Sequence, residues 1–501
     1  MKAAASGLFQ HREEQNLRTK VAAAVSSLLV ATSLLAGVGY SKPAAPVSQK
    51  HTYVIAFQSS LPANYESIVT KAGGKVLRAL PELGGLEVES DRPDFLSNLS
   101  GVSGIRAANR EMVHKLDPDP AGADGLPVTD IPQNAETYWP YQWDIQRVTN
   151  NGASYKLETG GTKHADGTVR HKAVVGVIDS GIDANHPDLK ANFLGGMNFV
   201  PAGVDASEKG DPNDIRDRDG HGTHVAGSIA ANGKVKGVGP DLGIRSYRVF
   251  AAEGGAPTSW IAAAIVQAAN DKVDVINMSI GGFDGIARYT YEGLKYSDVA
   301  DMLLWKRAVQ YAVSRNVTVV AAAGNEELNL NDAHAVVDYM NQSYGELGFT
   351  FKSAVREVPG TLPGVINVSS SNQWSTDHIA FYSNYGSTID VAAPGGDNGP
   401  VYDASRNLDE RDFHYRTLST WPTYLEPYFT SNLSGYALLH GTSMAAPKVA
   451  GIAGVIKAAH PEYTPAQVQS LIKQTAVDLG KSGQDPLFGT GEANIYKALS
   501  R

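Results

Sequence analysis

The chain has 501 residues, which is too long for one compact core, so a main domain with at least one appended module is expected. Hydrophobic residues make up 42% and charged residues 19%, with 51 Gly and 25 Pro, a composition typical of a loop-rich globular protein and unlike a disordered or fibrous one. The net charge of -9 argues against nucleic acid as a partner, and the lack of cysteine excludes disulfides, thiolate metal sites and a cysteine nucleophile.

The first residues carry the pattern of a targeting segment. Basic residues precede an apolar run from Val21 to about Tyr40, which predicts a signal peptide over residues 1–40 and a secreted, extracellular protein. The run is also just long enough to span a bilayer, so anchoring at the cell envelope by an uncleaved segment is the alternative. Nothing after Ser443 is apolar enough to span a membrane, so no stable membrane association is expected once the segment is removed.

Residues 51–116, called here the N-terminal module, predict a compact α+β unit. Strands are expected over Thr52–Phe57 and Gly85–Glu89, with a helix over Tyr65–Ala72 between them. Residues 117–140 follow as an acidic linker rich in Pro and Gly. Such a stretch marks a domain boundary that is open to proteolysis.

Residues 141–501 alternate apolar strands with amphipathic helices, which predicts an α/β domain with a doubly wound, mostly parallel sheet. The clearest strands are Ala173–Ile178, Val273–Met278, Val317–Ala322 and Val365–Ser369. Helices are expected over Thr223–Ala231, Trp260–Asn270, Ala300–Ser314, Ser443–His460 and Thr464–Thr475.

Three glycine-rich segments of this domain hold Asp179, His221 and Ser443, in that order. Asp179 ends a buried parallel strand, where open α/β sheets build their sites, although Asp-Ser-Gly by itself is also an ordinary turn. Ser443 opens a helix whose positive end favours an oxyanion, although an N-capping serine has the same local sequence. The order acid, base, nucleophile is one of the known orders of a serine triad, which indicates peptide-bond hydrolysis.

His221 and His224 lie about one helical turn apart, so they suit either a general base or a pair of metal ligands. The zinc spacing His-Glu-x-x-His is absent and no third ligand is obvious, which favours the general base. Asn325 closes another buried strand, and its amide is placed to donate to an oxyanion, with a plain turn as the alternative.

Together these segments resemble the subtilisin-like serine peptidase family over residues 141–501. The resemblance implies that Asp179 orients His221, that His221 is the general base and then the general acid, that Ser443 attacks the scissile carbonyl, and that Asn325 belongs to the oxyanion hole. It also implies two walls around the substrate residue before the cut, and an opposing edge that pairs with substrate. The first wall is Ser279, Ile280, Gly281 and Gly282, the second wall is Ala322, Ala323 and Gly324, and the edge is Gly254, Gly255 and Ala256.

The N-terminal module is similar to the inhibitory propeptide of that family, which implies a precursor that processes itself in or near the 117–140 linker. A permanent accessory domain is the alternative. The expected partners are a peptide or protein substrate and the chain's own propeptide, with no nucleic acid, and the protein is expected to be a monomer.

Asp188 matches one calcium ligand of the family, but the stretch between Ala231 and Gly237 is shortened, so the family's high-affinity calcium loop is expected to be missing. The carboxylates of Asp211, Asp214, Asp217 and Asp219 are hard oxygen ligands too, yet their pattern is more typical of a solvated acidic loop. No cofactor is therefore expected, and calcium alone is left open.

Three stretches exceed a minimal subtilisin, namely 283–304, 327–353 and 397–436, and we expect them to rim the substrate cleft. With the Tyr141–Ile145 segment, they make the chain most similar to bacterial subtilases of the lantibiotic leader peptidase type. The predicted function is a secreted serine endopeptidase. The alternatives are a dedicated leader peptidase, whose loops would restrict access, and a catalytically silent subtilase that binds peptides. An α/β-hydrolase esterase is disfavoured because Gly-x-Ser-x-Gly is absent at Ser443.

Overall fold

The computed structural model of the protein describes residues 50–116, 129–164, 166–252, 255–291, 293–427 and 433–501. Its main element is a seven-stranded parallel sheet in the order β20-β19-β16-β12-β8-β10-β9, which confirms the predicted α/β class. The strands are β8 (Val174–Asp179), β9 (Phe193–Asn198), β10 (Gly243–Arg248), β12 (Val275–Met278), β16 (Thr318–Ala322), β19 (Val365–Ser371) and β20 (Val391–Pro394).

Helices cover the two faces of this sheet, and alternate residues of the strands pack against each layer. On β16, Val320 belongs to the cluster of α5 (His221–Ala230) and α10 (Thr442–Ala459), whereas Val319 and Ala321 belong to the cluster of α6 (Thr258–Asn270) and α7 (Val299–Ser314). The strand is therefore buried at every position and apolar from Val319 to Ala322, as expected when both faces of a parallel sheet are covered.

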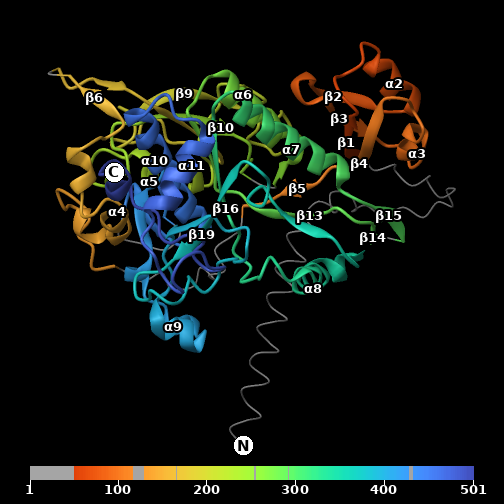
Figure 1. Ribbon diagram of the computed structural model, residues 1–501. Helices are drawn as coiled ribbons and strands as arrows, with labels where there is room; N and C mark the ends of the chain where they lie inside the picture. The colour runs from red at the N-terminus through yellow and green to blue at the C-terminus, as the bar shows by residue number, and fades with distance from the viewer. Residues whose placement is uncertain (1–49, 117–128, 165, 253–254, 292, 428–432) are drawn as a thin grey trace, which may run out of the picture. The chain divides into compact units, whose positions relative to one another are not determined.

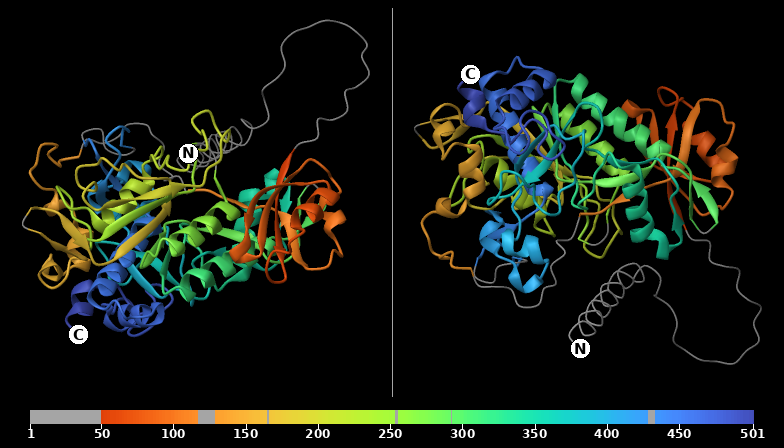
Figure 2. Two further views of the ribbon diagram at one scale, coloured as in Figure 1. Left: turned by 90° about the horizontal axis from the view of Figure 1, so that it is seen from above. Right: turned by 60° about the horizontal axis from the view of Figure 1, so that its bottom comes forward.

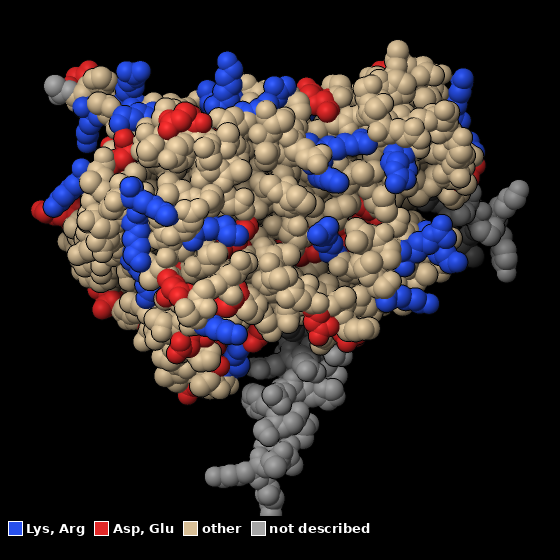
Figure 3. Space-filling view, viewed as in Figure 1, with Lys and Arg blue, Asp and Glu red and all other residues tan. Residues whose placement is uncertain are grey.

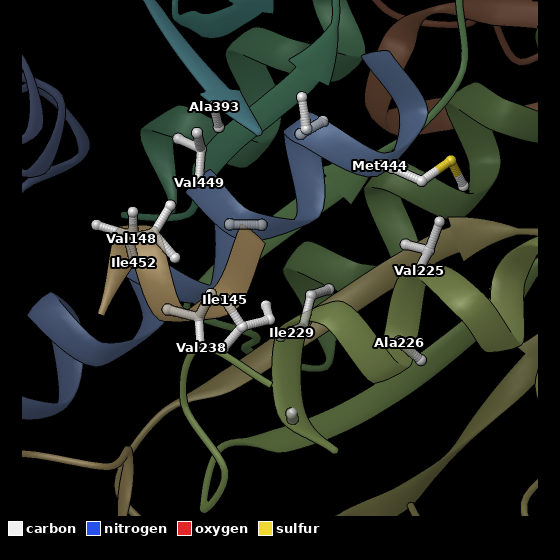
Figure 4. Packing of buried hydrophobic residues seen from close by; sticks show 14 of the residues in the cluster. Ile145, Val148, Val225, Ala226, Ile229, Val238, Ala393, Met444, Val449 and Ile452 are labelled. Carbon is white, nitrogen blue, oxygen red and sulfur yellow. The ribbon is translucent and has the colours of Figure 1, made fainter. Parts of the chain in front are cut away.

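The core of the first helix layer brings distant segments of the chain together. Val449 and Ile452 of α10 lie beside Ile145 and Val148 of α4 (Trp143–Val148), as Figure 4 shows. All four side chains are almost completely buried. Because α10 carries Ser443 near its beginning, this packing holds the start of the helix against the sheet edge.

The N-terminal module forms a four-stranded antiparallel sheet, β2-β3-β1-β4, with two helices on one face. Its elements are β1 (His51–Phe57), α2 (Tyr65–Ala72), β2 (Lys75–Leu80), β3 (Gly85–Ser90), α3 (Phe95–Leu99) and β4 (Ile105–Arg110). On β1, Tyr53 and Ile55 pack with the module's own helices, while Val54 and Ala56 pack with the cluster of α6 and α7. The expected strands and helix are present with nearly the same ends.

The other face of this small sheet lies against α6 and α7 (Figures 1 and 2). Arg307 of α7 donates hydrogen bonds to the backbone carbonyls of Phe57 (2.6 Å) and Leu83 (2.8 Å). Trp260 of α6 donates through Nε1 to Glu87 Oε1 at 3.2 Å. Apolar burial and hydrogen bonds therefore both hold the module to the parallel-sheet domain.

The first two long stretches, 283–304 and 327–353, contribute to one lobe. It contains a three-stranded sheet of β15 (Leu294–Tyr296), β14 (Tyr289–Tyr291) and β17 (Phe349–Thr350), together with α8 (Ala333–Tyr344). Phe283, Tyr289, Val336, Met340 and Phe351 form its buried core. These two stretches, which are predicted to rim the substrate cleft, therefore also build a packed core of their own.

Acidic and basic side chains are interspersed on the face drawn in Figure 3. Within the described ranges, no helix combines the length and apolar character needed to cross a membrane. The predicted signal peptide, 1–40, and the first half of the predicted linker, 117–128, lie outside those ranges.

Candidate active site

Asp179 and His221 meet at the carboxyl edge of the parallel sheet. Asp179 is the last residue of β8 and His221 is the first residue of α5, and Asp179 Oδ1 lies 2.8 Å from His221 Nδ1. The side chain of Asp179 is 1% exposed and that of His221 is 13% exposed. Burial by itself lowers the pKa of His221, but the Asp179 carboxylate, with smaller contributions from Asp219 and Asp217, outweighs burial and the pKa rises to about 9. The imidazole is thus an oriented and strengthened base.

Asp217 organises the turn that presents this pair. Its carboxylate is fully buried and accepts five hydrogen bonds. The donors are Ser180 Oγ (2.9 Å), the N–H groups of Asp219 (3.1 Å), Gly220 (2.8 Å) and Thr223 (2.8 Å), and Thr223 Oγ1 (2.6 Å). The prediction of a solvated loop is wrong for Asp217, because glycine and hydroxyl donors on both sides enclose its charge. Gly220 and Thr223, which lie close to Asp217 in the sequence, were the signal that could have predicted its burial.

Ser443 is the second residue of α10, so its backbone N–H has no acceptor within the helix. Its hydroxyl donates to the Ser279 carbonyl at 3.2 Å in this conformation. Asn325 Oδ1 accepts from both the N–H and the hydroxyl of Thr442, each at 2.8 Å. Because two donors hold that oxygen, the orientation of the amide is determined and Nδ2 is its donor end. A helix start and an amide nitrogen are both the kind of donor that can stabilise an oxyanion.

The first and second walls approach each other closely beyond Ser443. Ser279 Oγ donates to the Ser443 carbonyl at 2.7 Å, which ties the first wall to α10. A Cβ built on Gly281 would lie only 3.6 Å from the Gly324 Cα, so glycine keeps the interval open. The remaining wall residues behind these glycines, Ile280, Ala322 and Ala323, are buried.

The predicted pairing edge is already paired. Strand β11 (Ala256–Pro257) runs antiparallel to β5 (Val113–His114), the tail of the N-terminal module, with Ala256 opposite His114. A Cβ on Gly255 would lie 2.3 Å from the His114 carbonyl oxygen, so this approach requires glycine. Gly254 lies outside the described residues.

The His114 side chain is buried between the edge and the first wall. Its Nε2 lies 3.1 Å from Thr258 Oγ1, and its ring packs edge-on against Trp305 at a centroid distance of 5.3 Å. On the other side, a Cβ on Gly282 would lie 2.6 Å from His114 Nδ1. Burial lowers the pKa of His114 to about 4, so the ring is neutral there at pH 7.

His224 has a structural environment. Its ring is fully buried, and Nε2 lies 3.3 Å from the Thr417 carbonyl oxygen and 3.2 Å from that of Ala437. Burial, with a smaller contribution from Lys448, lowers its pKa to about 3. The neutral ring therefore holds α5 against the distant segments that contain Thr417 and Ala437. Of the two histidines, only His221 contacts Asp179.

Asp188, the weak calcium candidate, does not have the surroundings of a cation. Its Oδ2 accepts hydrogen bonds from the Val235 N–H at 3.0 Å and from the Tyr436 hydroxyl at 3.1 Å. Hydrogen-bond donors therefore occupy the positions where calcium would need further oxygen ligands. No cluster of three or more ionisable metal ligands occurs in the part of the chain that the structure describes.

Comparison with known proteins agrees with this arrangement. The model of the subtilase family matches residues 170–491, and the chain belongs to that family. It is 33% identical over 345 residues to the nisin leader peptide-processing serine protease of Lactococcus lactis subsp. lactis, covering 68% of this chain and 47% of that relative. It is 32% identical over 365 residues to the epidermin leader peptide-processing serine protease of Staphylococcus epidermidis, covering 72% and 74% of the two chains.

A solved structure extends the similarity to the N-terminal module. The crystal structure of the epidermin leader peptide-processing serine protease from Staphylococcus aureus gives a TM-score of 0.71 at 28% identity, and the match covers 90% of this chain and 98% of that one. The predicted family and fold are confirmed. The chain spans about half the length of the nisin-processing relative.

Proposed function

We propose that this protein is a secreted serine endopeptidase that hydrolyses peptide bonds through an acyl-enzyme. The observation that carries the proposal is the 2.8 Å contact between Asp179 and His221, combined with Ser443 at the start of a buried helix. His221 takes the proton of Ser443 Oγ as the oxygen attacks the scissile carbonyl, and then gives that proton to the leaving amine. In the second half of the reaction, His221 takes a proton from water as the water attacks the acyl carbon. His221 then returns that proton to Ser443 Oγ as the acyl group leaves.

The proposed oxyanion donors are Asn325 Nδ2 and the Ser443 N–H. Both belong to groups whose orientation is set before substrate arrives, since Thr442 holds the Asn325 oxygen and α10 holds the Ser443 backbone. Preorganised donors cost no reorganisation when charge develops, which is why they favour the transition state over the ground state.

The proposed substrate is an extended peptide. It would add a strand to β11 in the way that β5 does, with the residue before the cut lying between the two walls. The N-terminal module would then act as an inhibitory propeptide, because its tail occupies the same edge. Enzyme and module would form a monomeric precursor, processed in or near the 117–140 linker.

A precursor peptide with a leader segment is the specific substrate that the relatives support. Two of them are named as processing the leader peptides of nisin and epidermin. The lobe formed by 283–304 and 327–353 fits this narrower function, because added structure beside a cleft restricts which chains enter it.

The test compares the purified wild-type chain with Ser443→Ala. The mass of each is followed over time, with an unfolded protein and a leader-bearing precursor peptide added as substrates. We expect only the wild type to lose its N-terminal segment and to cleave substrate, while circular dichroism shows that Ser443→Ala is folded. Normal processing by Ser443→Ala would contradict the triad, and cleavage of the precursor peptide alone would favour the dedicated leader peptidase.

A further inference from the structure

The first turn of α10 contains a carbonyl that the helix itself leaves without a donor. In an α-helix, the carbonyl of each residue accepts a hydrogen bond from the N–H four residues later. For Ser443 that later residue is Pro447, which lies inside α10 and has no N–H. The missing hydrogen bond therefore falls on the residue that carries the proposed nucleophile.

The Ser279 hydroxyl takes the place of the missing N–H. Ser279 Oγ donates to the Ser443 carbonyl at 2.7 Å. Ser279 is the first residue of the first wall and is 1% exposed, so its side chain is shielded from water. A buried carbonyl without a donor is costly. The hydrogen bond from the first wall thus restores what proline removes from the helix.

Asn277 of β12 sets the direction of this hydrogen bond. Asn277 is fully buried, and its Nδ2 donates to Ser279 Oγ at 3.0 Å. A carbonyl can only accept and a hydroxyl has one proton, so that proton points to the Ser443 carbonyl and the Ser279 oxygen accepts from Asn277. A chain of two hydrogen bonds therefore runs from the parallel sheet to Ser443.

The second wall holds the residue before Ser443. The Gly324 N–H donates to Thr442 Oγ1 at 3.2 Å, and the Thr442 N–H and hydroxyl both donate to Asn325 Oδ1. The Ser443 hydroxyl, in turn, donates to the Ser279 carbonyl at 3.2 Å. Ser443 is therefore held through its neighbour in the chain, at its hydroxyl and at its carbonyl, and Ser279 makes the last two of these contacts.

We propose that Ser279, oriented by Asn277, is a positioning residue for Ser443. Its hydroxyl replaces the helix hydrogen bond that Pro447 removes, and so it fixes Ser443 Oγ in place relative to His221 and the oxyanion donors. The inference rests on the proposed function, since it concerns how the nucleophile of that function is held. The Ser279 hydroxyl keeps its own proton throughout the reaction.

A residue that only lined the wall would behave differently. It would change which substrate side chains bind, and hence KM and the preference among peptides, whereas a positioning residue changes the rate at which Ser443 reacts. The reagent diisopropyl fluorophosphate separates the two roles. It phosphorylates a serine oxygen with release of fluoride, and it carries no peptide side chain to place between the walls.

The first measurement compares Ser279→Ala with the wild type, with rates taken per mole of processed chain as counted by mass spectrometry. We expect kcat on a short peptide to fall by about 10- to 10²-fold with little change in KM, because a small misplacement of the reacting oxygen lowers turnover. The rate of phosphorylation of Ser443 should fall by a similar factor. Ser246→Ala is the matched control and should leave both rates unchanged, because Ser246 of β10 is equally buried and its hydroxyl has no hydrogen-bond partner in the described part of the chain. A wild-type rate of phosphorylation in a folded Ser279→Ala variant would overturn the inference.

The second measurement uses Pro447→Ala to restore the helix hydrogen bond. With an N–H at position 447, the Ser443 carbonyl regains a donor within α10. Adding Ser279→Ala to this background should then lower kcat by less than about threefold, compared with the larger loss in the presence of Pro447. Equal losses in the two backgrounds would overturn the positioning role. Ser279→Cys keeps the shape of the side chain with a much weaker donor, and it provides the same comparison if Ser279→Ala does not fold.

Failure of the proposed function gives a different result. A wild-type chain that cleaves neither peptides nor unfolded protein, and is not phosphorylated at Ser443, would contradict the proposed function itself. A wild type that does both, with no effect of Ser279→Ala on either rate, would overturn only the positioning role.

Discussion

At the scale of single residues, the site depends on side chains that hold the reacting groups as well as on the reacting groups themselves. Asp217 accepts hydrogen bonds from both segments that carry Asp179 and His221. Thr442 has the same role for Asn325, since its two donors determine which end of the amide is available. The orientation of the proposed base and of the proposed oxyanion donor is thus built into the resting protein.

Replacing Asp217 with Asn should disturb the turn that presents Asp179 and His221, because Asp217 is a positioning residue and not a reacting one. The substitution replaces one carboxylate oxygen with an NH2 group, which cannot accept the hydrogen bonds made to that oxygen. We therefore expect the free energy of unfolding to fall by about 2–4 kcal/mol. Denaturant unfolding in the Ser443→Ala background, which prevents self-digestion, measures this loss. Asp211→Asn, at an exposed aspartate of the same segment, is the control, and equal stability of the two variants would contradict the positioning role.

Replacing Asn325 with Ala should remove one oxyanion donor. We expect kcat to fall by roughly 10²- to 10³-fold with little change in KM, because the hydrogen bond strengthens only as negative charge develops on the substrate oxygen. Steady-state kinetics on a short peptide measures both constants. An unchanged kcat would show that Asn325 only closes a turn.

The pH dependence of kcat/KM should reflect His221. The general base acts in its neutral form, and Asp179 raises its pKa to about 9, so activity should increase with pH and level off only in the alkaline range. Below that pKa, the neutral fraction falls about tenfold for each unit of pH. An uncharged peptide assayed from pH 5 to 10 provides the profile, and a plateau already reached at pH 6 would contradict this assignment.

At the scale of elements, β5 and β11 show how the N-terminal module reaches the site. Val113 and His114 pair with β11, and Gly255 beside that strand allows the two backbones to approach closely. The His114 side chain fills the space next to β11. The module's sheet, in turn, is held on α6 and α7 by Arg307 and Trp260. The tail is therefore positioned by contacts far from Ser443.

The affinity of the module should weaken in acid through His114. Its pKa is about 4 when buried and near 6.5 when free, so release takes up a proton between these values. The contribution of neutral His114 to binding is fully present above about pH 6.5 and is lost as pH falls toward 4. The measurement is inhibition of processed enzyme by added module at pH 7.5 and 5.0. In a module that carries His114→Gln, the inhibition should depend less on pH. An equal pH dependence of inhibition in both modules would contradict the role of His114.

At the scale of the whole molecule, the three long stretches behave differently from one another. The first two build one aromatic lobe, although about twenty residues separate them in the sequence. The third contributes β21 (Thr417–Thr420), whose Ser419 and Thr420 donate to carbonyls of His224 and Thr223 in α5. An apparent surface insertion therefore supports the helix that presents His221.

The sequence by itself determined the family, the α/β class, and the positions of most core strands and helices. These follow from local signals, because buried strands are continuously apolar and the triad segments combine their reactive residue with glycines. Tertiary structure alone decided that the Ser180 hydroxyl joins the local donors around Asp217 and that the module's tail pairs with β11. Each of these depends on contacts between segments far apart in the chain, and burial of a charge cannot be read from its immediate neighbours when its partners come from another strand or loop.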